Sequence, residues 1–299
     1  MTSLSFSTAT RPMAALAPIP TWRRGLRRVL GHRGLALGGI LLAAVFAPWL
    51  SPHDPYAQDV TQRLIPPFWN AKGSWEHILG TDKLGRDYLS RLLFGARVSL
   101  EIGVVTALVA GLIGTTLGVL AGYFGGRVDA VVSYIITTRL AMPVVLVALA
   151  TASLVGGSLQ VVIILLGSLL WDRFAIVTRS AAQQLRDAEF IAAAKALGAS
   201  TPYILLRELL PNVLLPLAAF FLLGVAVIIV VEGSLSFLGL GVPPPISSWG
   251  SMIGEGRESL EVAPRLAFLP AAAMFLTVLA FNLVGDTLRA LTDPRQGAL

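Results

Sequence analysis

The chain has 299 residues, of which 55% are hydrophobic and only 13% are charged, and its mean hydropathy is +0.74. This composition excludes a water-soluble globular protein of average make-up and predicts an all-α integral membrane protein. The formal net charge of +6 comes without interleaved basic and aromatic residues, which argues against a nucleic-acid partner and indicates contact with the lipid bilayer.

The N-terminal end of the chain is basic. Residues 1–33 contain six arginines and no acidic residue. Because most of these arginines directly precede an apolar run, we interpret the run as an uncleaved anchor, and the positive-inside rule places its basic flank in the cytoplasm. We expect a basic cytoplasmic tail over residues 1–28, the first transmembrane helix and an extracytoplasmic segment over 29–97, and a core domain over 98–299.

Six segments are predicted to cross the bilayer, since a spanning helix needs about 20 mostly apolar residues. They cover residues 34–50, 98–122, 131–154, 159–177, 213–231 and 266–288. Six crossings that start in the cytoplasm return the C-terminus to the cytoplasm. The polar segment 180–211 is then also cytoplasmic, whereas residues 51–97 lie outside.

Particular residues in these spans have structural consequences. Gly111, Gly114 and Gly118 recur near one face of the second span, which favours close helix packing. In the third span Pro143 predicts a kink, and Arg139 lies about nine residues deep. A cation at that depth is costly, and it fits either structural pairing or contact with a transported solute, so Arg139 is a candidate for the substrate pathway. Beyond the fifth span, the run 239–249 contains three prolines and predicts an irregular loop.

Residues 187–212 form a polar helix-turn-helix between two apolar runs. Residues 181–197 are rich in helix-favouring types, and Gly198 stands where a left-handed C-terminal cap is needed. Thr201 is predicted to cap a second helix with Pro202 at its first position, and Pro211 to end or kink that segment. A simple connector lying on the membrane is the alternative interpretation of these residues.

The spacing within this hairpin matches a known motif. The pattern is EAA, three residues, G, nine residues, I, one residue, LP, and the matching positions are Ala193, Ala194, Gly198, Leu210 and Pro211. Ala192 stands in place of the motif's Glu, and Glu208 in place of its Ile. With these two departures, the segment resembles the cytoplasmic loop of ABC importer permeases.

Three further segments resemble one subgroup, the dipeptide/oligopeptide/nickel permeases. They are HILGTDKLGRDYLSRLLFGARVSL at 77–100, EGSLSFLGLGVPPPISSW at 232–249 and LAFNLVGDTLRALTDPR at 279–295. The resemblance extends from about residue 30 to residue 295. Within the subgroup, the long hydrophilic segment after the first span is similar to that of the C-type membrane subunit.

The resemblance implies a type I ABC importer transmembrane domain with six helices in a bacterial inner membrane. Its implied partners are a second homologous permease, two ATP-binding subunits and an extracytoplasmic substrate-binding protein. The hairpin would couple the chain to the ATPases, through residues carried over from the motif and its surroundings: Ala193, Ala194, Gly198, Ala199, Leu210 and Pro211.

The sequence itself carries no signature of catalysis. None of Lys72, Lys83 and Lys195 belongs to a phosphate-binding G-x-x-x-x-G-K-[ST] loop, so ATP and Mg²⁺ are expected on partner subunits and no cofactor in this chain. The chain has no cysteine, and its three histidines form no metal-binding pattern in sequence, so we predict neither a catalytic nor a metal site. His53 and His77 could meet in the outer segment.

Two other functional classes remain as alternatives. A secondary transporter driven by an ion gradient would typically show an internal repeat and a central acid, neither of which is evident. A membrane-bound enzyme would need a nucleophile-base pair, and none is evident. The cargo is open: peptides are implied by the resemblance, and nickel, glutathione or another small solute is the alternative.

Overall fold

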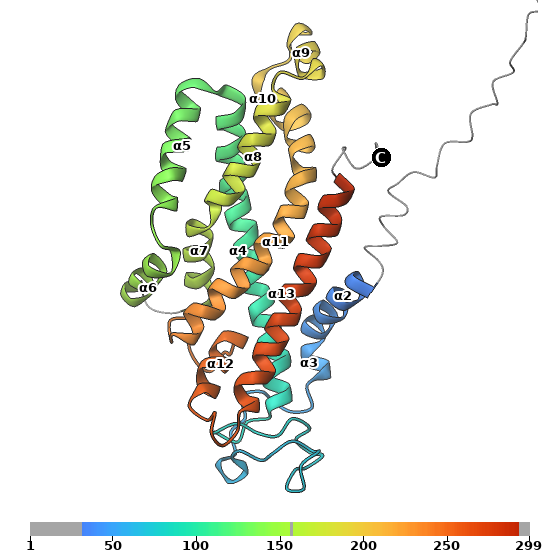
Figure 1. Cartoon of the computed structure of the whole chain (residues 1–299), viewed down its shortest axis with the longest axis vertical. Coiled ribbons are helices and arrows are strands. Elements are labelled where there is room, and N and C mark those ends of the chain that lie inside the picture. The colour runs from blue at the N-terminus through green and yellow to red at the C-terminus, as the bar shows by residue number, and fades with distance from the viewer. Residues whose placement is uncertain (1–31, 156–157, 293–299) are drawn as a thin grey trace, which may run out of the picture.

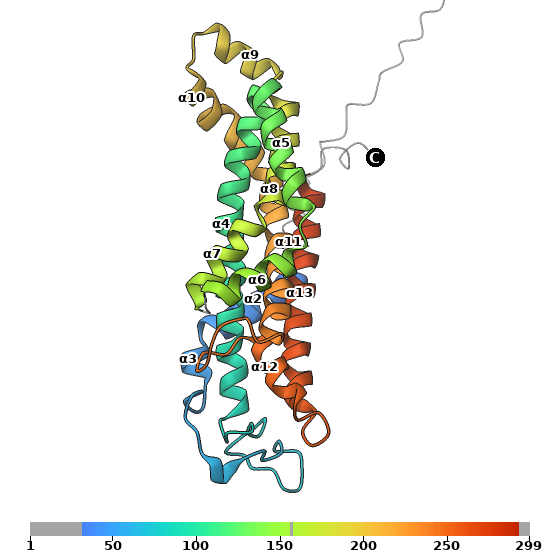
Figure 2. The same ribbon diagram turned by 90° about the vertical axis from the view of Figure 1, so that its left-hand side faces the viewer.

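A computed structural model describes residues 32–155 and 158–292 of the chain. These residues form an elongated bundle of helices (Figure 1). The hairpin 187–212 lies at one end of the bundle and the loop segment 51–87 at the other, as the perpendicular view in Figure 2 also shows. The described residues contain no β-strand beyond one isolated bridge between Thr81 and Asp87, in agreement with the all-α prediction.

Most of the helices follow one another with short connections, and the longer ones are the loop 51–87 and the segment 238–248. Their bounds are α2 (His32–Val45), α3 (Ala47–Leu50), α4 (Tyr88–Phe124), α5 (Gly126–Leu140), α6 (Val144–Val155), α7 (Leu159–Leu169), α8 (Trp171–Leu185), α9 (Glu189–Ala196), α10 (Thr201–Tyr203), α11 (Leu210–Phe237), α12 (Trp249–Arg257) and α13 (Arg265–Thr292). A 3₁₀ turn (Val60–Gln62) lies in the long loop, and a π-helical turn (Ile204–Leu209) precedes α11.

Helices α4, α11 and α13 are each long and apolar enough to cross a membrane. Helix α4 begins ten residues before the predicted span because Asp87 caps it, with its Oδ2 accepting a hydrogen bond from the Ser90 amide at 2.8 Å. Its 37 residues extend about 55 Å, against a hydrocarbon core of about 30 Å. The start of α4 therefore belongs to the polar end of the molecule.

The predicted third and fourth spans are each broken into two helices. Helices α5 and α6 meet at 81°, and the break falls directly before α6 at Pro143, as the kink prediction requires. Helices α7 and α8 meet at 41° around Leu170. The described part of the chain thus has three spanning helices, or up to five if each bent pair counts as one span.

The first predicted span corresponds to the shorter helices α2 and α3. The 14 residues of α2 extend about 21 Å, less than the thickness of a bilayer core. The basic tail expected over residues 1–28 lies outside the described residues.

Helix α4 packs closely against α8, and glycines make the approach possible. A Cβ at Gly114 would lie 2.6 Å from Phe174 Cβ, and a Cβ at Gly122 would lie 2.6 Å from Ala182 Cβ. At Gly118 it would collide with Thr178 Oγ1 and with the backbone of α8. Packing through a face of small residues is thereby confirmed for Gly114 and Gly118. Gly111 contacts α8 less tightly, at 3.6 Å from Phe174 to the same hypothetical atom.

The proline-rich run leads into a helix that the sequence did not predict. Residues 239–248 are irregular, as expected, and α12 follows with a capping box between Ser248 and Ser251. Trp249 and Met252 are buried in the core, where α12 packs against α11, α13 and α4. Its nine residues are too few to span a bilayer, which explains why a search for apolar spans misses it.

Replacing Gly118 with alanine should lower the free energy of unfolding by about 1–3 kcal/mol, because the added methyl group overpacks the α4–α8 contact. On the same helix, Gly111→Ala should leave stability unchanged or raise it by up to about 1 kcal/mol, since its methyl group fits and alanine favours helix. Equilibrium unfolding of both variants in mixed micelles measures the difference between their free energies of unfolding. Equal stability of the two would contradict the packing assignment.

Candidate functional site

The polar hairpin connects the end of α8 to the start of α11. Helix α8 ends at Leu185, the chain turns through residues 186–188, and α9 follows from Glu189. The prediction of a single helix over 181–197 is therefore wrong, because the turn divides this segment between two helices. Arg186 and Asp187, two adjacent polar residues that form an ion pair at 3.2 Å, occupy the turn.

Gly198 ends α9 in the predicted left-handed conformation, with φ at +80°. The Gly198 amide donates to the Lys195 carbonyl, and the Ala199 amide donates to the Ala194 carbonyl, both at 3.0 Å. Together these bonds form a Schellman motif, which satisfies the last carbonyls of the helix. Ala194 and Ala199 thus close the tip through their backbones, which fixes the direction of the returning chain.

The second half of the hairpin differs from its predicted form at both ends. Ser200 rather than Thr201 is the N-cap residue of α10, and its side chain makes no capping hydrogen bond. Pro211 does not end the helical segment, because it lies in the first turn of α11 directly after a π-helical turn that widens the backbone where the proline ring would otherwise clash. The returning chain therefore runs continuously from Thr201 into α11.

A small apolar base holds the hairpin on the bundle. Ile191 of α9 is fully buried, as is Leu209, and Ile204 is nearly so. Leu209 packs with Val119 of α4 and Val213 of α11 in a satellite core at this end of the molecule. The hairpin is therefore fixed to the helices beneath it.

The residues carried over from the motif fall into two groups, one exposed to solvent and one partly buried. Ala193, Gly198 and Pro211 are exposed, whereas Ala194, Ala199 and Leu210 are half-buried. Leu210 joins the satellite core, so it contributes to the base of the hairpin rather than to its outer surface.

The outer surface also presents large apolar side chains that the sequence interpretation missed. Leu197 is 88% exposed at the tip, and Phe190, Tyr203 and Leu206 are exposed elsewhere on the hairpin. Leu197 directly precedes the capping glycine, at the end of α9, where no neighbouring side chain covers it. Its position next to Gly198 was the feature of the sequence that could have predicted this exposure. An exposed apolar group on a polar hairpin is typical of a protein contact surface.

Arg139 is buried at the junction of the two broken helix pairs. Its Nη1 donates to the Met142 carbonyl at 3.2 Å, in the break between α5 and α6, and its Nη2 donates to the Leu169 carbonyl at the end of α7. Both carbonyls belong to helix ends that lack the next helical donor. This arrangement favours structural pairing of Arg139 over direct contact with a solute.

At the opposite end of the bundle, a buried ion network ties the start of α4 to α12. The Arg91 Nη1 donates to Asp82 Oδ2 at 2.6 Å and to Glu255 Oε2 at 2.9 Å, and Arg86 contacts the same two carboxylates. The side chains of Arg91 and Asp82 are 2% and 5% exposed. Nearby, the Lys83 ammonium pairs with Glu258 on the surface and lowers the pKa of that carboxyl.

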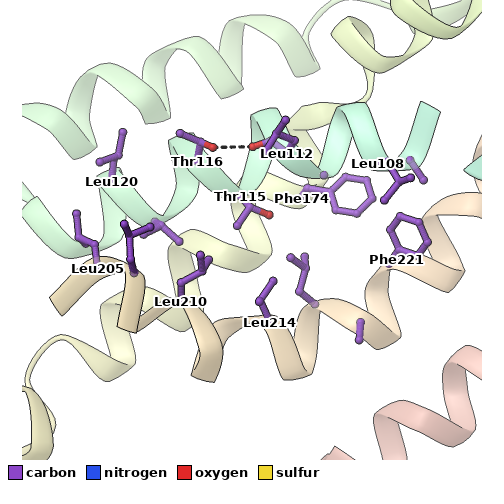
Figure 3. Close-up of a pocket in the computed structure, with 16 residues that line it drawn as sticks. Leu108, Leu112, Thr115, Thr116, Leu120, Phe174, Leu205, Leu210, Leu214 and Phe221 are labelled. Carbon is purple, nitrogen blue, oxygen red and sulfur yellow. Dashed lines mark hydrogen bonds between the residues drawn. The ribbon is translucent and has the colours of Figure 1, made fainter. Parts of the chain in front are cut away.

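Between the two ends, an apolar groove opens on the side of the bundle. It has a volume of about 680 Å³ and lies between α4 and α11, with Phe174 of α8 at its base (Figure 3). Leu112 on its rim is 72% exposed. Thr115 and Thr116 are its polar side chains, and Thr116 donates to the Leu112 carbonyl within its own helix. The groove therefore suits an apolar neighbour.

Comparison with known proteins identifies the family. A family model described as a binding-protein-dependent transport system inner membrane component matches residues 114–297, more than half of the chain. The chain belongs to this family of transport permeases. A second model, the N-terminal transmembrane domain of oligopeptide transport permease C, matches residues 21–67 of the permease.

Curated relatives match the permease over nearly its whole length. It is 38% identical to a glutathione transport system permease protein of Pectobacterium atrosepticum over 92% of this chain and 90% of that protein. It is 36% identical to a dipeptide transport system permease protein of Alkalihalophilus pseudofirmus, over 93% and 91% of the two chains. The family is a membrane component of transport systems and is not itself catalytic.

A solved structure supports the fold. The permease resembles a chain in the inward-facing MetNI methionine ABC transporter with a TM-score of 0.55 and 18% sequence identity, over 69% of this chain and 98% of that one. The bundle therefore has the fold of that permease chain. The family match, the relatives and the apolar helices together show that the permease is a multi-pass membrane protein.

Substituting Arg91 with methionine should destabilise the permease by about 3 kcal/mol, because Asp82 is left buried with a single cationic partner. Lys83→Met removes a cation from the exposed pair with Glu258 and should leave stability essentially unchanged. Thermal unfolding of the two variants in one detergent makes the comparison. If both variants lost the same amount of stability, the buried Arg91 network would contribute no more to stability than the exposed pair of Lys83 with Glu258.

Proposed function

We propose that the permease is one of two membrane subunits of an ATP-driven importer of peptides, or of a related small solute such as glutathione or nickel, in a bacterial inner membrane. Membership of the permease family and relatives named for peptide and glutathione transport support this proposal. The single observation that carries it is the rigid hairpin at one end of the bundle, which exposes apolar side chains while its base is fixed in the core.

The proposed topology has six crossings, with both termini and the hairpin in the cytoplasm. Six arginines in residues 1–33 support a cytoplasmic N-terminus. The hairpin and the loop 51–87 lie at opposite ends of the bundle, so a cytoplasmic hairpin places that loop outside, toward a substrate-binding protein (Figure 2). ATP would be hydrolysed on two partner subunits beneath the hairpin.

Coupling would proceed through the hairpin as a lever. Closure of the ATPase dimer would displace the tip around Leu197, and the capped turn at Gly198 would transmit the force without bending. Helices α8 and α11 continue directly from the two sides of the hairpin, so the displacement would rotate both against the rest of the bundle. Ala193 and Ala194 would keep α9 narrow enough for a groove on the ATPase.

A second permease subunit is the proposed occupant of the apolar groove between α4 and α11. The groove is open along the side of the bundle, and Leu112 on its rim is largely exposed. The end of the groove nearest the hairpin is lined by Leu205 and Leu206 of the π-helical turn, so a neighbour seated there would contact the root of the hairpin. Displacement of the hairpin would then be transmitted to both permease subunits through this contact.

Replacing Gly198 with valine should lower ATP-driven uptake about 5- to 30-fold. A β-branched residue in the left-handed region costs about 1–2 kcal/mol, which lowers the ratio of native to alternative tip conformations by that factor and sets the upper limit of the loss. The matched variant Gly198→Asn tolerates this conformation and should retain most of the uptake. Uptake of a labelled dipeptide by proteoliposomes that contain the whole importer is the measurement.

Wild-type uptake by a normally inserted Gly198→Val variant would contradict the lever. Uptake driven by a proton gradient in the absence of ATP would instead support a secondary transporter.

Because the chain has no cysteine, single cysteines can report both proposed contacts. Leu197→Cys carrying a benzophenone maleimide should crosslink to an ATPase subunit on illumination, and Leu112→Cys should crosslink to the second permease. Leu209→Cys, at a fully buried position, should remain unlabelled in the folded complex and is the control. Crosslinking of Leu197→Cys to the substrate-binding protein would overturn the proposed orientation.

A further inference from the structure

Two histidines and an aspartate that are distant in the sequence converge where the loop 51–87 meets α4. His53 stands near the start of the loop, His77 near its end, and Asp87 at the N-cap of α4. One ligand atom from each side chain lies within 4.8 Å of the others. The sequence showed no metal-binding pattern because the three positions are separated by 24 and 10 residues, and only the folded loop brings them together.

The three side chains are held by neighbouring groups. The Asp87 carboxylate is 1% exposed, and its Oδ2 accepts from the Ser90 amide and hydroxyl, which leaves Oδ1 facing the histidines. His77 Nδ1 lies 2.9 Å from this Oδ1 and His53 Nδ1 lies 3.8 Å from it. The two imidazole rings are 4.9 Å apart between centroids. The ligand atoms are thus presented by a preformed frame.

With the Gln62 amide oriented so that its oxygen faces the ring, neutral side chains leave one hydrogen-bonding position of His77 unfilled. His77 Nε2 lies 2.7 Å from Gln62 Oε1, so both nitrogens of His77 face acceptor oxygens, while a neutral ring carries one N–H. If that N–H donates to Gln62, the lone pair of Nδ1 faces the Asp87 carboxylate with no positive charge between them. The Nδ1 of His53 is buried and has no hydrogen-bond partner.

We propose that His53 Nδ1, His77 Nδ1 and Asp87 Oδ1 bind one divalent transition-metal ion, with Zn²⁺ as the best fit. Two imidazoles and a carboxylate suit Zn²⁺ at about 2.0–2.2 Å from each ligand, and a fourth position is left for water or an exogenous ligand. Gln62 fixes the tautomer of His77 from the outer shell, and Ser90 fixes the carboxylate. The partly exposed ring of His53 provides the entry path.

The ion would connect three parts of this end of the permease. His53 follows α3, His77 belongs to the long loop, and Asp87 begins α4, the longest helix of the bundle. A metal bound to all three would hold the loop against the start of α4. This inference does not depend on the cargo or on the coupling mechanism.

The test uses the full importer complex purified with a tag that contains no histidine run, stripped with EDTA and titrated with Zn²⁺ against a chromogenic chelator. The wild-type complex should retain one more Zn²⁺ per permease chain than a His53→Gln/His77→Gln variant. X-ray absorption at the zinc edge should show nitrogen and oxygen ligands alone, in keeping with a chain that lacks cysteine.

Single variants make the assignment specific. His53→Gln, at a partly exposed position that tolerates a polar side chain, should weaken Zn²⁺ binding by at least about tenfold, and Gln62→Leu by about 10- to 100-fold. His32→Gln removes the remaining histidine of the chain and should leave binding unchanged. Equal Zn²⁺ content in the wild type and the double variant would overturn the proposal and leave the cluster as a hydrogen-bonded junction between the loop and α4.

Discussion

The close approach of α4 to α8 is the contact on which the rest of the structure depends. Glycines at 114, 118 and 122 allow the backbones to meet where side chains would hold them apart. In a bilayer, lipid chains are as apolar as the side chains they cover, so helices associate through close packing rather than through hydrophobic burial. Because α8 leads to the hairpin and α4 leads to the long loop, this contact connects the two polar ends.

The hairpin gains its rigidity from few residues. A Schellman turn at Gly198 satisfies the carbonyls of α9, and Ile191, Ile204 and Leu209 fix the base. The π-helical turn then lets the chain pass Pro211 and enter α11 without a break. A tip that is exposed and a base that is buried are what the proposed lever requires, since a force applied to the tip would be passed to the helices that hold the base.

The opposite end is organised by charge. Arg91 and Arg86 bring Asp82 of the loop and Glu255 of α12 together, so the loop, α4 and α12 form one unit. Arg139 has a comparable role in the middle of the bundle, where it joins the carbonyls of two broken helices. In each case a cation satisfies groups that would be costly to bury alone, and the helices around it are held in place.

The sequence by itself determined the all-α membrane class, the position of the hairpin, the left-handed turn at Gly198, the break at Pro143 and the small face of α4. These features are local, because apolar length, glycine and proline act through the nearest turns of the chain. Only the tertiary structure decided that α4 begins at Tyr88, that α12 forms, that Leu197 is exposed and that Arg139 meets two helix ends. It also decided that His53, His77 and Asp87 share one site, since that depends on how a 37-residue loop folds back and not on any spacing within the sequence.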